Sequence, residues 1–386
     1  MENFIFHNPT KLIFGEGQIK HLPEEVLKHG DRVLIVTGKG SVKRSGLFAE
    51  AVALLKNKCT IFELEGIDPN PRLDSVREGV RICKDNNVNL VLAIGGGSVV
   101  DAAKGIASGA LYDGDVWDFY MRKIDVAEAL PIGVILTLAA TGSEMNGNSV
   151  VTNMETHEKK GCPSIHQYPT FSILDPTYTF TVPRADTVNG LVDIMAHVFE
   201  QYFSHTKDTP LQDRLCEGIL LTVIENAADV LADPEDYVAR ANILLSGTFA
   251  LNGLTRMGVI GDWASHGIAH QPSGLYDVPH GAALAIILPH WMRHVLDEGV
   301  DKFKQYATKV WKVPESFGDD REIALEGIRR TAKFFELMGA PTSLQEYGIG
   351  ADVIDMMAER ATEAGPLGSY KKLYFDDVKT ILSKCI

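Results

Sequence analysis

The feature that most constrains the fold is a change in hydrophobic periodicity near residue 183. Before that point, short apolar runs rich in β-branched residues alternate with amphipathic stretches. The apolar runs cover residues 33–36, 90–94 and 132–136, and helical patterns cover residues 47–57 and 73–86. Apolar strands that alternate with amphipathic helices are typical of βαβ units in a parallel sheet. Residues 1–182 are therefore predicted to form a Rossmann-like α/β domain.

After residue 183, strand-like runs nearly vanish and apolar residues recur at helical spacing. The helical patterns cover residues 186–202, 211–231, 234–251 and 321–338. Apolar residues at positions i, i+3, i+4 and i+7 are the signature of an amphipathic helix. Residues 183–386 are therefore predicted to form a second, all-α domain.

Composition excludes several classes of protein. The chain has 386 residues and a net charge of −14, so a nucleic-acid partner is not expected, because phosphate binding needs a basic face. The five cysteines are scattered and show no CxxC spacing, which favours free thiols in a reducing compartment. The N-terminus does not look like a signal peptide, and the longest apolar run, Gly281–Leu288, is too short to cross a bilayer. We therefore expect a cytoplasmic protein.

A glycine-rich turn follows the second apolar run and opens a helical stretch. It consists of Gly95, Gly96, Gly97 and Ser98. Glycines tolerate positive φ angles and let a ligand approach the backbone, and the first turn of a helix offers free amides to an anion. We favour a pyrophosphate site here. The alternative is a tight strand-to-helix turn with Ser98 as the N-cap. The spacing is not GxGxxG, so the dinucleotide fingerprint is absent.

The turn after the first apolar run differs in charge. It holds Gly38, Lys39, Gly40 and Ser41, followed by Lys43 and Arg44, and it contains no acidic residue. Sites for NAD commonly place a carboxylate on the ribose 2′-hydroxyl, whereas sites for NADP bring cations to the 2′-phosphate. The turn therefore favours NADP, although a solvated basic loop would look the same.

Acid and histidine residues cluster in the second half at helical spacing. Asp193 and His197 are four residues apart, as are His266 and His270, and His280 follows a turn-like segment, Pro272–Gly274. Residues four apart share a helix face, and several such groups can converge on one divalent ion. A single pair of this kind is more often a surface or capping interaction. We interpret His290 and His294 in that way.

These motifs together resemble the iron-containing alcohol dehydrogenase family, in particular its butanol-dehydrogenase-like branch. The matching segments are Phe6–Gly15, Gly95–Lys104 (GGGSxxDxAK), Thr141–Glu144 (TGSE), Trp263–His270 and Pro279–Gly281. They extend along nearly the whole chain in the family's order. The resemblance implies an N-terminal α/β nucleotide-binding domain, shared with dehydroquinate synthases, and an all-helical C-terminal domain.

The resemblance also implies roles for individual residues. The metal ligands would be Asp193, His197, His266 and His280, and His270 would be a catalytic residue near the metal. The residues implied in cofactor binding are Gly95, Gly96, Gly97, Ser98, Asp101, Thr137, Leu138 and Lys160, in addition to the first turn with Gly38, Lys39, Gly40 and Ser41. The metal would be Fe(II) or Zn(II).

One segment departs from the wider family pattern PTTxGTGSE. This chain has Leu136–Glu144, LTLAATGSE, which is similar to the butanol-dehydrogenase-like branch. NAD-preferring relatives tend to carry an aspartate in the first turn, where this chain has Gly38 and Lys39. The resemblance therefore implies NADP(H) in preference to NAD(H).

The expected activity is hydride transfer between NADP(H) and a small primary alcohol or aldehyde, such as butanol or butanal. The metal would polarise the substrate oxygen, His270 would relay a proton, and the cofactor would supply the hydride. Trp263, Phe249 and Leu254 indicate an apolar pocket. The alternatives are an NAD-dependent glycerol- or propanediol-type dehydrogenase, a dehydroquinate-synthase-like lyase, and an inactive metal- or nucleotide-binding regulator. A homodimer or larger homo-oligomer is expected from the resemblance.

Overall fold

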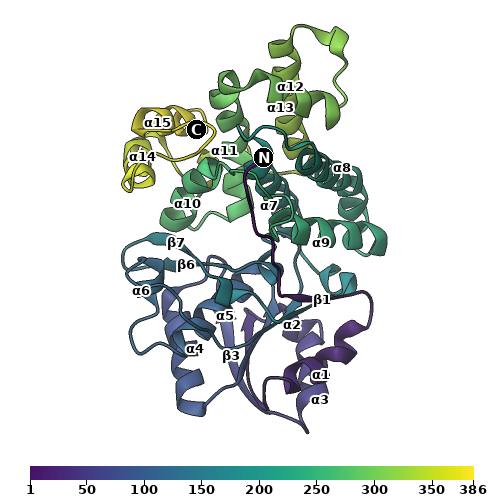
Figure 1. Ribbon diagram of the computed structural model, residues 1–386, viewed down its shortest axis with the longest axis vertical. Coiled ribbons are helices and arrows are strands. Elements are labelled where there is room, and N and C mark those ends of the chain that lie inside the picture. Colours follow the sequence, from purple (N-terminus) through teal and green to yellow (C-terminus); the bar gives the residue numbers. More distant parts are fainter. The chain divides into compact units, whose positions relative to one another are not determined.

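The computed structural model describes all residues from 1 to 386, and they form two compact units. The α/β unit contains residues 7–182 and 233–252, and the helical unit contains residues 1–6, 183–232 and 253–386. The colours of Figure 1 follow the sequence, so each unit combines distant parts of the colour bar: the helical unit contains the purple N-terminal residues, and the α/β unit contains the green helix α9 (Tyr237–Leu251). Each unit is described by itself.

The α/β unit is built on a parallel sheet of six strands in the order β1-β8-β5-β4-β2-β3. The strands are β1 (Lys11–Phe14), β2 (Arg32–Gly38), β3 (Thr60–Ile67), β4 (Leu90–Gly95), β5 (Ile132–Leu136) and β8 (Phe171–Leu174). The three predicted apolar runs correspond to β2, β4 and β5, and all three are buried between neighbouring strands. Continuous apolar runs suit such strands because both of their faces are covered.

Helices cover both faces of this sheet. They are α1 (Leu22–Leu27), α2 (Ser41–Arg44), α3 (Leu47–Leu55), α4 (Leu73–Asn86), α5 (Gly97–Gly109) and α6 (Trp117–Tyr120). Side chains of a strand alternate between its faces: Val33 and Ile35 pack with residues of α1 and α3, whereas Leu34 and Val36 pack with residues of α4 and α5. Two apolar cores therefore hold the sheet in a doubly wound arrangement.

Two further elements belong to the α/β unit. A hairpin of β6 (Asn148–Asn153) and β7 (Glu158–Pro163) forms a separate antiparallel sheet. Helix α9 (Tyr237–Leu251) also packs here, because Leu244 joins the core that contains α4 and α5 and the Thr248 hydroxyl donates to the buried Glu144 carboxylate. The compact units therefore differ at residues 1–6 and 233–252 from a single division at residue 182.

The helical unit contains no strand; its residues 367 and 373 form an isolated bridge. Its helices are α7 (Arg184–Tyr202), α8 (Pro210–Ala232), α10 (Ala264–Tyr276), α11 (His280–Val295), α12 (Val300–Lys309), α13 (Asp320–Met338), α14 (Ile354–Thr362) and α15 (Phe375–Ser383). The predicted fold class, a parallel α/β domain followed by a helical region, is confirmed. None of the helices is long and apolar enough to cross a membrane.

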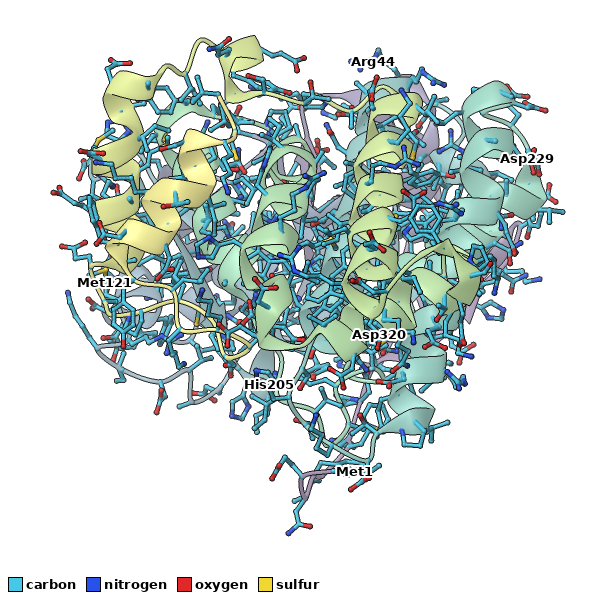
Figure 2. All side chains as sticks on the ribbon, turned by 90° about the horizontal axis from the view of Figure 1, so that it is seen from above. Met1, Arg44, Met121, His205, Asp229 and Asp320 are labelled. Atoms are coloured by element: carbon cyan, nitrogen blue, oxygen red, sulfur yellow. The ribbon has the colours of Figure 1, made fainter.

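The first residues of the chain pack on the helical unit. The Met1 amino group donates to the Lys207 carbonyl, and the Glu2 amide donates to the Gly258 carbonyl at 3.0 Å. Figure 2 labels Met1 and His205, which lies in the loop after α7. The His205 ring stacks on Tyr370 with 4.4 Å between ring centroids, so this loop is fixed to the C-terminal segment of the same unit.

Candidate active site

Helix α7 places two candidate ligands side by side in the interior of the helical unit. Asp193 and His197 are one turn apart, and their side chains are almost completely buried. The His197 Nδ1 atom lies 3.9 Å from Asp193 Oδ1, which is too far for a hydrogen bond. Burial lowers the pKa of His197 to about 4, against the raising effect of Asp193. The imidazole is therefore neutral at pH 7, which is the form that can bind a metal.

Helix α10 brings His266 to the same place. Its Nε2 atom lies 4.0 Å from Asp193 Oδ1, and its ring stacks on His197 with 4.8 Å between centroids. The predicted turn at Pro272–Gly274 is wrong, because α10 continues through Pro272 to Tyr276. Proline removes a single amide from a helix, and α10 tolerates this near its C-terminal end.

Helix α11 supplies His280 as its first residue. The His280 Nε2 atom lies 3.9 Å from Asp193 Oδ1. The next residue, Gly281, makes this approach possible, because a Cβ atom there would lie 2.1 Å from the Asn189 carbonyl oxygen of α7. A residue without a side chain is therefore required where the start of α11 meets α7.

The assembled donor set fits a divalent metal. Donor atoms of Asp193, His266 and His280 all lie within 4.8 Å of one another. Asp193 Oδ1, His197 Nδ1 and His266 Nε2 are buried and make no hydrogen bond. Buried polar atoms are normally paired, so a group of unpaired nitrogen and oxygen donors facing each other is typical of a metal site. His197 lies beside the three-residue set, in contact with Asp193 and His266.

Two other histidines of this region, His270 and His294, differ in their distance from the cluster. His270 is partly buried on α10, and its ring centroid lies 5.5 Å from that of His280. His294 instead pairs with Asp377 at 2.8 Å, on the far end of α11 from His280. The structure therefore brings His270 to the cluster and keeps His294 away from it.

One residue of this cluster was not predicted from the sequence. Glu200 of α7 is completely buried, and its carboxylate accepts a hydrogen bond from His266 Nδ1 at 2.7 Å. Burial raises the pKa of Glu200, but the hydrogen bonds from His266, Ser265 and the Trp263 amide outweigh it and hold the pKa below its usual value. Its spacing from Asp193 and His197 (i, i+4, i+7) is the signal that would have identified it.

The Gly95–Gly97 turn joins β4 to α5 in the α/β unit. None of the three glycines has a positive φ angle, so the expected conformational reason is wrong. They are required by close packing: a Cβ on Gly95 would lie 2.6 Å from Val99 Cγ2, and one on Gly97 would lie 2.3 Å from Thr141 Oγ1. The N-cap of α5 is Gly96 rather than Ser98, which is the second residue of the helix.

Two residues of the same motif fix the loop opposite this turn. The Asp101 carboxylate accepts from the Ser143 hydroxyl at 2.6 Å and from the Val150 amide at 3.1 Å. The ammonium group of the fully buried Lys104 donates to Ser143 Oγ and to the Asn146 carbonyl, both at 2.8 Å. Burial lowers the pKa of Lys104 to about 8. The motif thus connects α5 to the loop that begins at Thr137, whose amide donates to the Gly95 carbonyl.

The first βα turn carries acidic partners that its own sequence does not contain. Lys39 forms an ion pair with Asp68, the residue after β3, and Lys43 forms one with Glu65 of β3. Strand β3 is the parallel neighbour of β2, and Gly38 is in register with Ile67. Both lysines are therefore partly neutralised by the adjacent strand.

The remaining predicted cofactor residues lie in the same unit. Leu138 packs on the glycine turn, since its Cβ is 3.2 Å from the position of a Cβ on Gly96. Gly40 has a φ of 95° and is the N-cap of α2, which begins at Ser41. Lys160 lies on β7 and pairs with Glu158 at 2.8 Å.

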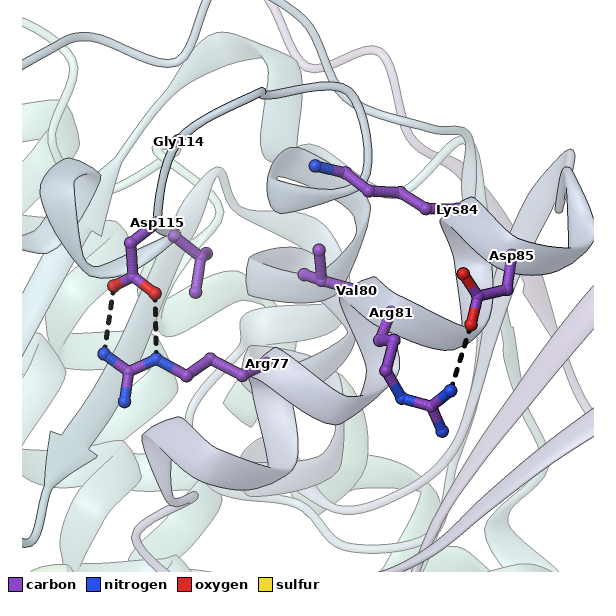
Figure 3. A pocket seen from close by; sticks show the side chains of 8 residues that line it. Arg77, Val80, Arg81, Lys84, Asp85, Gly114 and Asp115 are labelled. Carbon is purple, nitrogen blue, oxygen red and sulfur yellow. Dashed lines mark hydrogen bonds and ion pairs between the residues drawn. The ribbon is translucent and has the colours of Figure 1, made fainter.

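A separate pocket of about 370 Å³ lies on the outer side of α4. Figure 3 shows that its cations already have partners: Arg77 contacts Asp115, and Arg81 contacts Asp85. The Lys84 ammonium donates to the Tyr112 carbonyl. This pocket contains none of the predicted site residues.

Comparisons with known proteins agree with this arrangement. The family model described as iron-containing alcohol dehydrogenase matches residues 9–176, and that of the C-terminal part of the Fe-containing family matches residues 187–386. A probable NADH-dependent butanol dehydrogenase of Bacillus subtilis is 51% identical over 99% of both chains. The NADPH-dependent aldehyde reductase YqhD of Escherichia coli is 39% identical over 95% of this chain and 94% of that one.

Solved structures give the same result. The crystal structure of NADH-dependent butanol dehydrogenase A from Thermotoga maritima superimposes with a TM-score of 0.96 and 40% identity, covering 100% of this chain and 99% of that one. The 1,3-propanediol dehydrogenase of Citrobacter freundii is more distant, at 29% identity over 92% of both chains. The chain is an NAD(P)-dependent oxidoreductase that acts on CH–OH groups, and it belongs to the iron-containing alcohol dehydrogenase family.

Proposed function

We propose that this enzyme transfers a hydride between NADP(H) and a small primary alcohol or aldehyde and depends on one divalent metal, Fe(II) or Zn(II). The observation that carries the proposal is the cluster of donor atoms around Asp193, in which Asp193 Oδ1, His197 Nδ1 and His266 Nε2 are buried and make no hydrogen bond. A site without sulfur ligands suits iron and zinc among the divalent metals. Asp193, His197, His266 and His280 would hold the ion.

The side chains around the ion have distinct tasks in this proposal. When bound, the metal supplies Lewis acidity to the substrate oxygen. The neutral imidazole of His197 and the carboxylate of Asp193 would bind the ion in the buried interior of the unit. Electrostatic attraction between the carboxylate and the ion is strong there, because little water screens it. The His270 ring lies 5.5 Å from that of His280 between centroids and, unlike Asp193 and His197, is only partly buried, which suits a group that passes a proton between the substrate and solvent.

The glycine turn is proposed to hold the cofactor. The α5 N-terminus at Gly96, Gly97 and Ser98 offers amides to the pyrophosphate. Asp101 holds the loop with Thr137 and Leu138 in place. Lys160 is proposed to contact the ribose, in line with the family resemblance.

The preference for NADP(H) rests on the first turn. Gly38 has no side chain that would exclude a 2′-phosphate, and Gly40 and Ser41 open a short helix beside Lys39. The Lys39–Asp68 pair works against this preference, because the carboxylate competes with a phosphate for the same ammonium group. Among the relatives, four butanol dehydrogenases that are 42% to 51% identical to this chain are named for NADH, and YqhD, at 39% identity, is named for NADPH. We retain NADP(H) as the preferred cofactor with NAD(H) as a slower alternative.

A small, largely apolar substrate is proposed. Trp263 packs edge-on against His266 with 5.3 Å between ring centroids, which puts an aromatic wall beside the metal cluster. The substrates in the names of two relatives, butanol and aldehydes, would fit such a pocket better than a polyanion would.

The test is a panel of straight-chain aldehydes, glycerol and 1,3-propanediol, each assayed with NADPH and NADH on protein of measured metal content. We expect butanal with NADPH to give the highest kcat/KM, and a chelator to abolish turnover until Fe(II) or Zn(II) is restored. Full activity of verified metal-free protein would refute the metal dependence. A preference for glycerol or propanediol with NADH would favour the alternative dehydrogenase.

We also propose a homodimer or larger homo-oligomer, a cytoplasmic location, and a division of the chain into domains 1–182 and 183–386. Light scattering on the purified enzyme tests the first, and fractionation of the native cells tests the second. Limited proteolysis tests the third: two fragments that separate and stay folded would support it, whereas instability of residues 1–182 without α9 would favour the compact units described above.

A further inference from the structure

The inference concerns Glu200, whose position on α7 relates it to the metal cluster. Asp193, His197 and Glu200 have the spacing i, i+4, i+7, so they lie along one face of the helix. All three are buried, and Glu200 is the most completely enclosed, with an exposed fraction of 0%. A buried carboxylate is costly unless its oxygens are paired. Its partners therefore indicate its role.

Every hydrogen bond to the Glu200 carboxylate comes from the start of α10. Oε1 accepts from His266 Nδ1 at 2.7 Å, from the Ser265 hydroxyl at 2.6 Å and from the His266 amide at 3.3 Å. Oε2 accepts from the Trp263 amide. Trp263 has a φ of 68°, an unfavourable conformation for a residue with a side chain, and this contact helps to hold it.

The hydrogen bond between Glu200 and His266 Nδ1 determines whether the other ring nitrogen, Nε2, carries a proton. An ionised carboxylate only accepts hydrogen bonds, so Nδ1 of His266 carries the proton. In the neutral ring, Nε2 then has a free lone pair. That Nε2 atom is buried, makes no hydrogen bond and lies 4.0 Å from Asp193 Oδ1. Carboxylate–histidine pairs of this kind orient metal ligands and raise their basicity.

We propose that Glu200 is a positioning residue that fixes the tautomer and the ring orientation of His266, so that Nε2 points at the metal. The inference rests on the proposed metal site. Glu200 lies on α7 together with the proposed ligands Asp193 and His197. Helix α7 would therefore position His266, the proposed ligand from α10, in addition to carrying two ligands itself. Glu200 itself does not touch the metal or the substrate.

The test compares two variants that change the contacts of the Glu200 carboxylate in different ways. Glu200→Gln keeps the shape but removes the charge that selects the Nδ1–H tautomer, and Ser265→Ala removes a partner of Glu200 without touching the imidazole. The readouts are the dissociation constant for Co(II), from competition with a chromogenic chelator, and the visible absorption bands of the bound Co(II).

Glu200→Gln should weaken Co(II) binding by about 10- to 100-fold and change the visible bands. Ser265→Ala should change the dissociation constant by less than about threefold. Equal affinities for the unmodified enzyme and Glu200→Gln, with lowered thermal midpoints of the metal-free proteins, would show that Glu200 only caps α10 and would overturn the inference. If the unmodified enzyme binds no Co(II), the proposed metal site fails first, and the inference fails with it.

A second measurement does not depend on the folding of a variant. Long-range ¹H–¹⁵N spectra of histidine-labelled, metal-free enzyme report the tautomer of each ring, and the His266 signals are identified by their absence in His266→Ala. We expect the Nδ1–H form for His266. The Nε2–H form would contradict the proposed role of Glu200, whatever the metal affinity.

Discussion

The candidate metal cluster of the helical unit and the glycine turn of the α/β unit are built on opposite principles. The cluster gathers polar side chains in the interior of its unit, where Asp193 and Glu200 are buried. The glycine turn is defined by missing side chains, and the charges of the first βα turn of the same unit, such as Lys39, are mostly exposed. Buried charges interact strongly because water does not screen them, whereas exposed ion pairs contribute little.

This difference leads to different expectations for the two proposed sites. We expect metal binding at the buried cluster to respond steeply to single substitutions, because solvent cannot replace the interactions there. We expect cofactor preference, which we ascribe to exposed charges around Gly38, to respond gradually. The predictions below are ordered by the size of the expected effect, and each one tests this contrast.

The largest effect is expected for His266→Ala. One of four proposed ligands is lost, and the Glu200 carboxylate is left buried without its main partner. Removing a residue that only supports a ligand typically weakens metal binding by about 10- to 100-fold. Removing the ligand itself should weaken it by more than about 100-fold, and turnover should fall with it. Metal analysis after dialysis and steady-state assays measure both. His294→Ala is the matched control, because His294 pairs with Asp377 outside the cluster; an equal loss in that variant would contradict the assignment.

Gly281→Ala should come next. The new Cβ would lie 2.1 Å from the Asn189 carbonyl oxygen, so α11 must move away from α7 and carry His280 with it. We expect a stability loss of about 1–3 kcal/mol and a clear drop in Co(II) affinity, measured by thermal unfolding and chelator competition. Gly218→Ala is the control: nothing lies within 4 Å of a Cβ there, and alanine in this exposed helix position should stabilise by about 1 kcal/mol.

Gly97→Ala tests the glycine turn of the α/β unit, again by adding a Cβ atom where there is no room for one. Its Cβ would lie 2.3 Å from Thr141 Oγ1, so the turn and the facing loop must separate. The Kd for NADPH, measured by fluorescence titration, should rise by about tenfold, as expected when an interaction worth about 1.4 kcal/mol is lost. Metal content should stay at the unmodified level. Unchanged NADPH affinity would show that the turn does not hold the cofactor.

Gly38→Asp should invert the cofactor preference without harming the fold. A Cβ at this position makes only ordinary contacts of 3.7 Å, so the change adds charge rather than strain. The carboxylate would repel a 2′-phosphate and accept from a ribose 2′-hydroxyl. The ratio of kcat/KM for NADPH over NADH should fall by about tenfold or more. An unaltered ratio would mean that the 2′ position lies elsewhere.

Asp68→Asn should have the smallest effect and the opposite sign. It releases Lys39 from its ion pair, and exposed pairs are worth about 0.2–1 kcal/mol, or up to about fivefold in a binding constant. The NADPH-over-NADH ratio should therefore rise by about two- to fivefold. Asp74→Asn, on the surface of α4, is the control and should leave the ratio unchanged. A change in Asp68→Asn as large as that in Gly38→Asp would contradict the small effect expected of an exposed ion pair.

Much of the fold followed from the sequence because periodicity reports local structure directly. The predicted helix at residues 73–86 has the bounds of α4, and the segment predicted at 186–202 lies within α7. The helix at 234–251 was also predicted, but its membership of the α/β unit was not. The contacts that decide this, from Leu244 and Thr248, join residues far apart in the chain.

In the candidate site, too, arrangements within one helix could be predicted from the sequence, whereas contacts between distant segments could not. Pairs on one helix, such as Asp193 with His197, can be identified by spacing alone. The acids opposite Lys39 and Lys43 could not be identified, because they depend on which strand lies beside β2 and in which register. Strand β3 is an edge strand that is mostly not buried, so its sequence lacks the continuous apolar run that revealed its neighbours. The spacing of Glu200 from Asp193 and His197 places it on their face of α7. Its contact with His266 could not be predicted, because the sequence does not show that α10 packs on α7.

The path of the chain has a consequence for attempts to dissect this enzyme. The polypeptide leaves one compact unit for the other after Phe6, after Val182, after Ala232 and after Asn252. A fragment that ends at residue 182 would lack α9, so it would expose the apolar surface that Leu244 covers and leave Glu144 without its Thr248 partner. Residues 1–182, which carry the proposed nucleotide site, are therefore not expected to fold as a transferable module without α9. An exchange of halves between relatives should preserve folding only when residues 233–252 travel with the sheet.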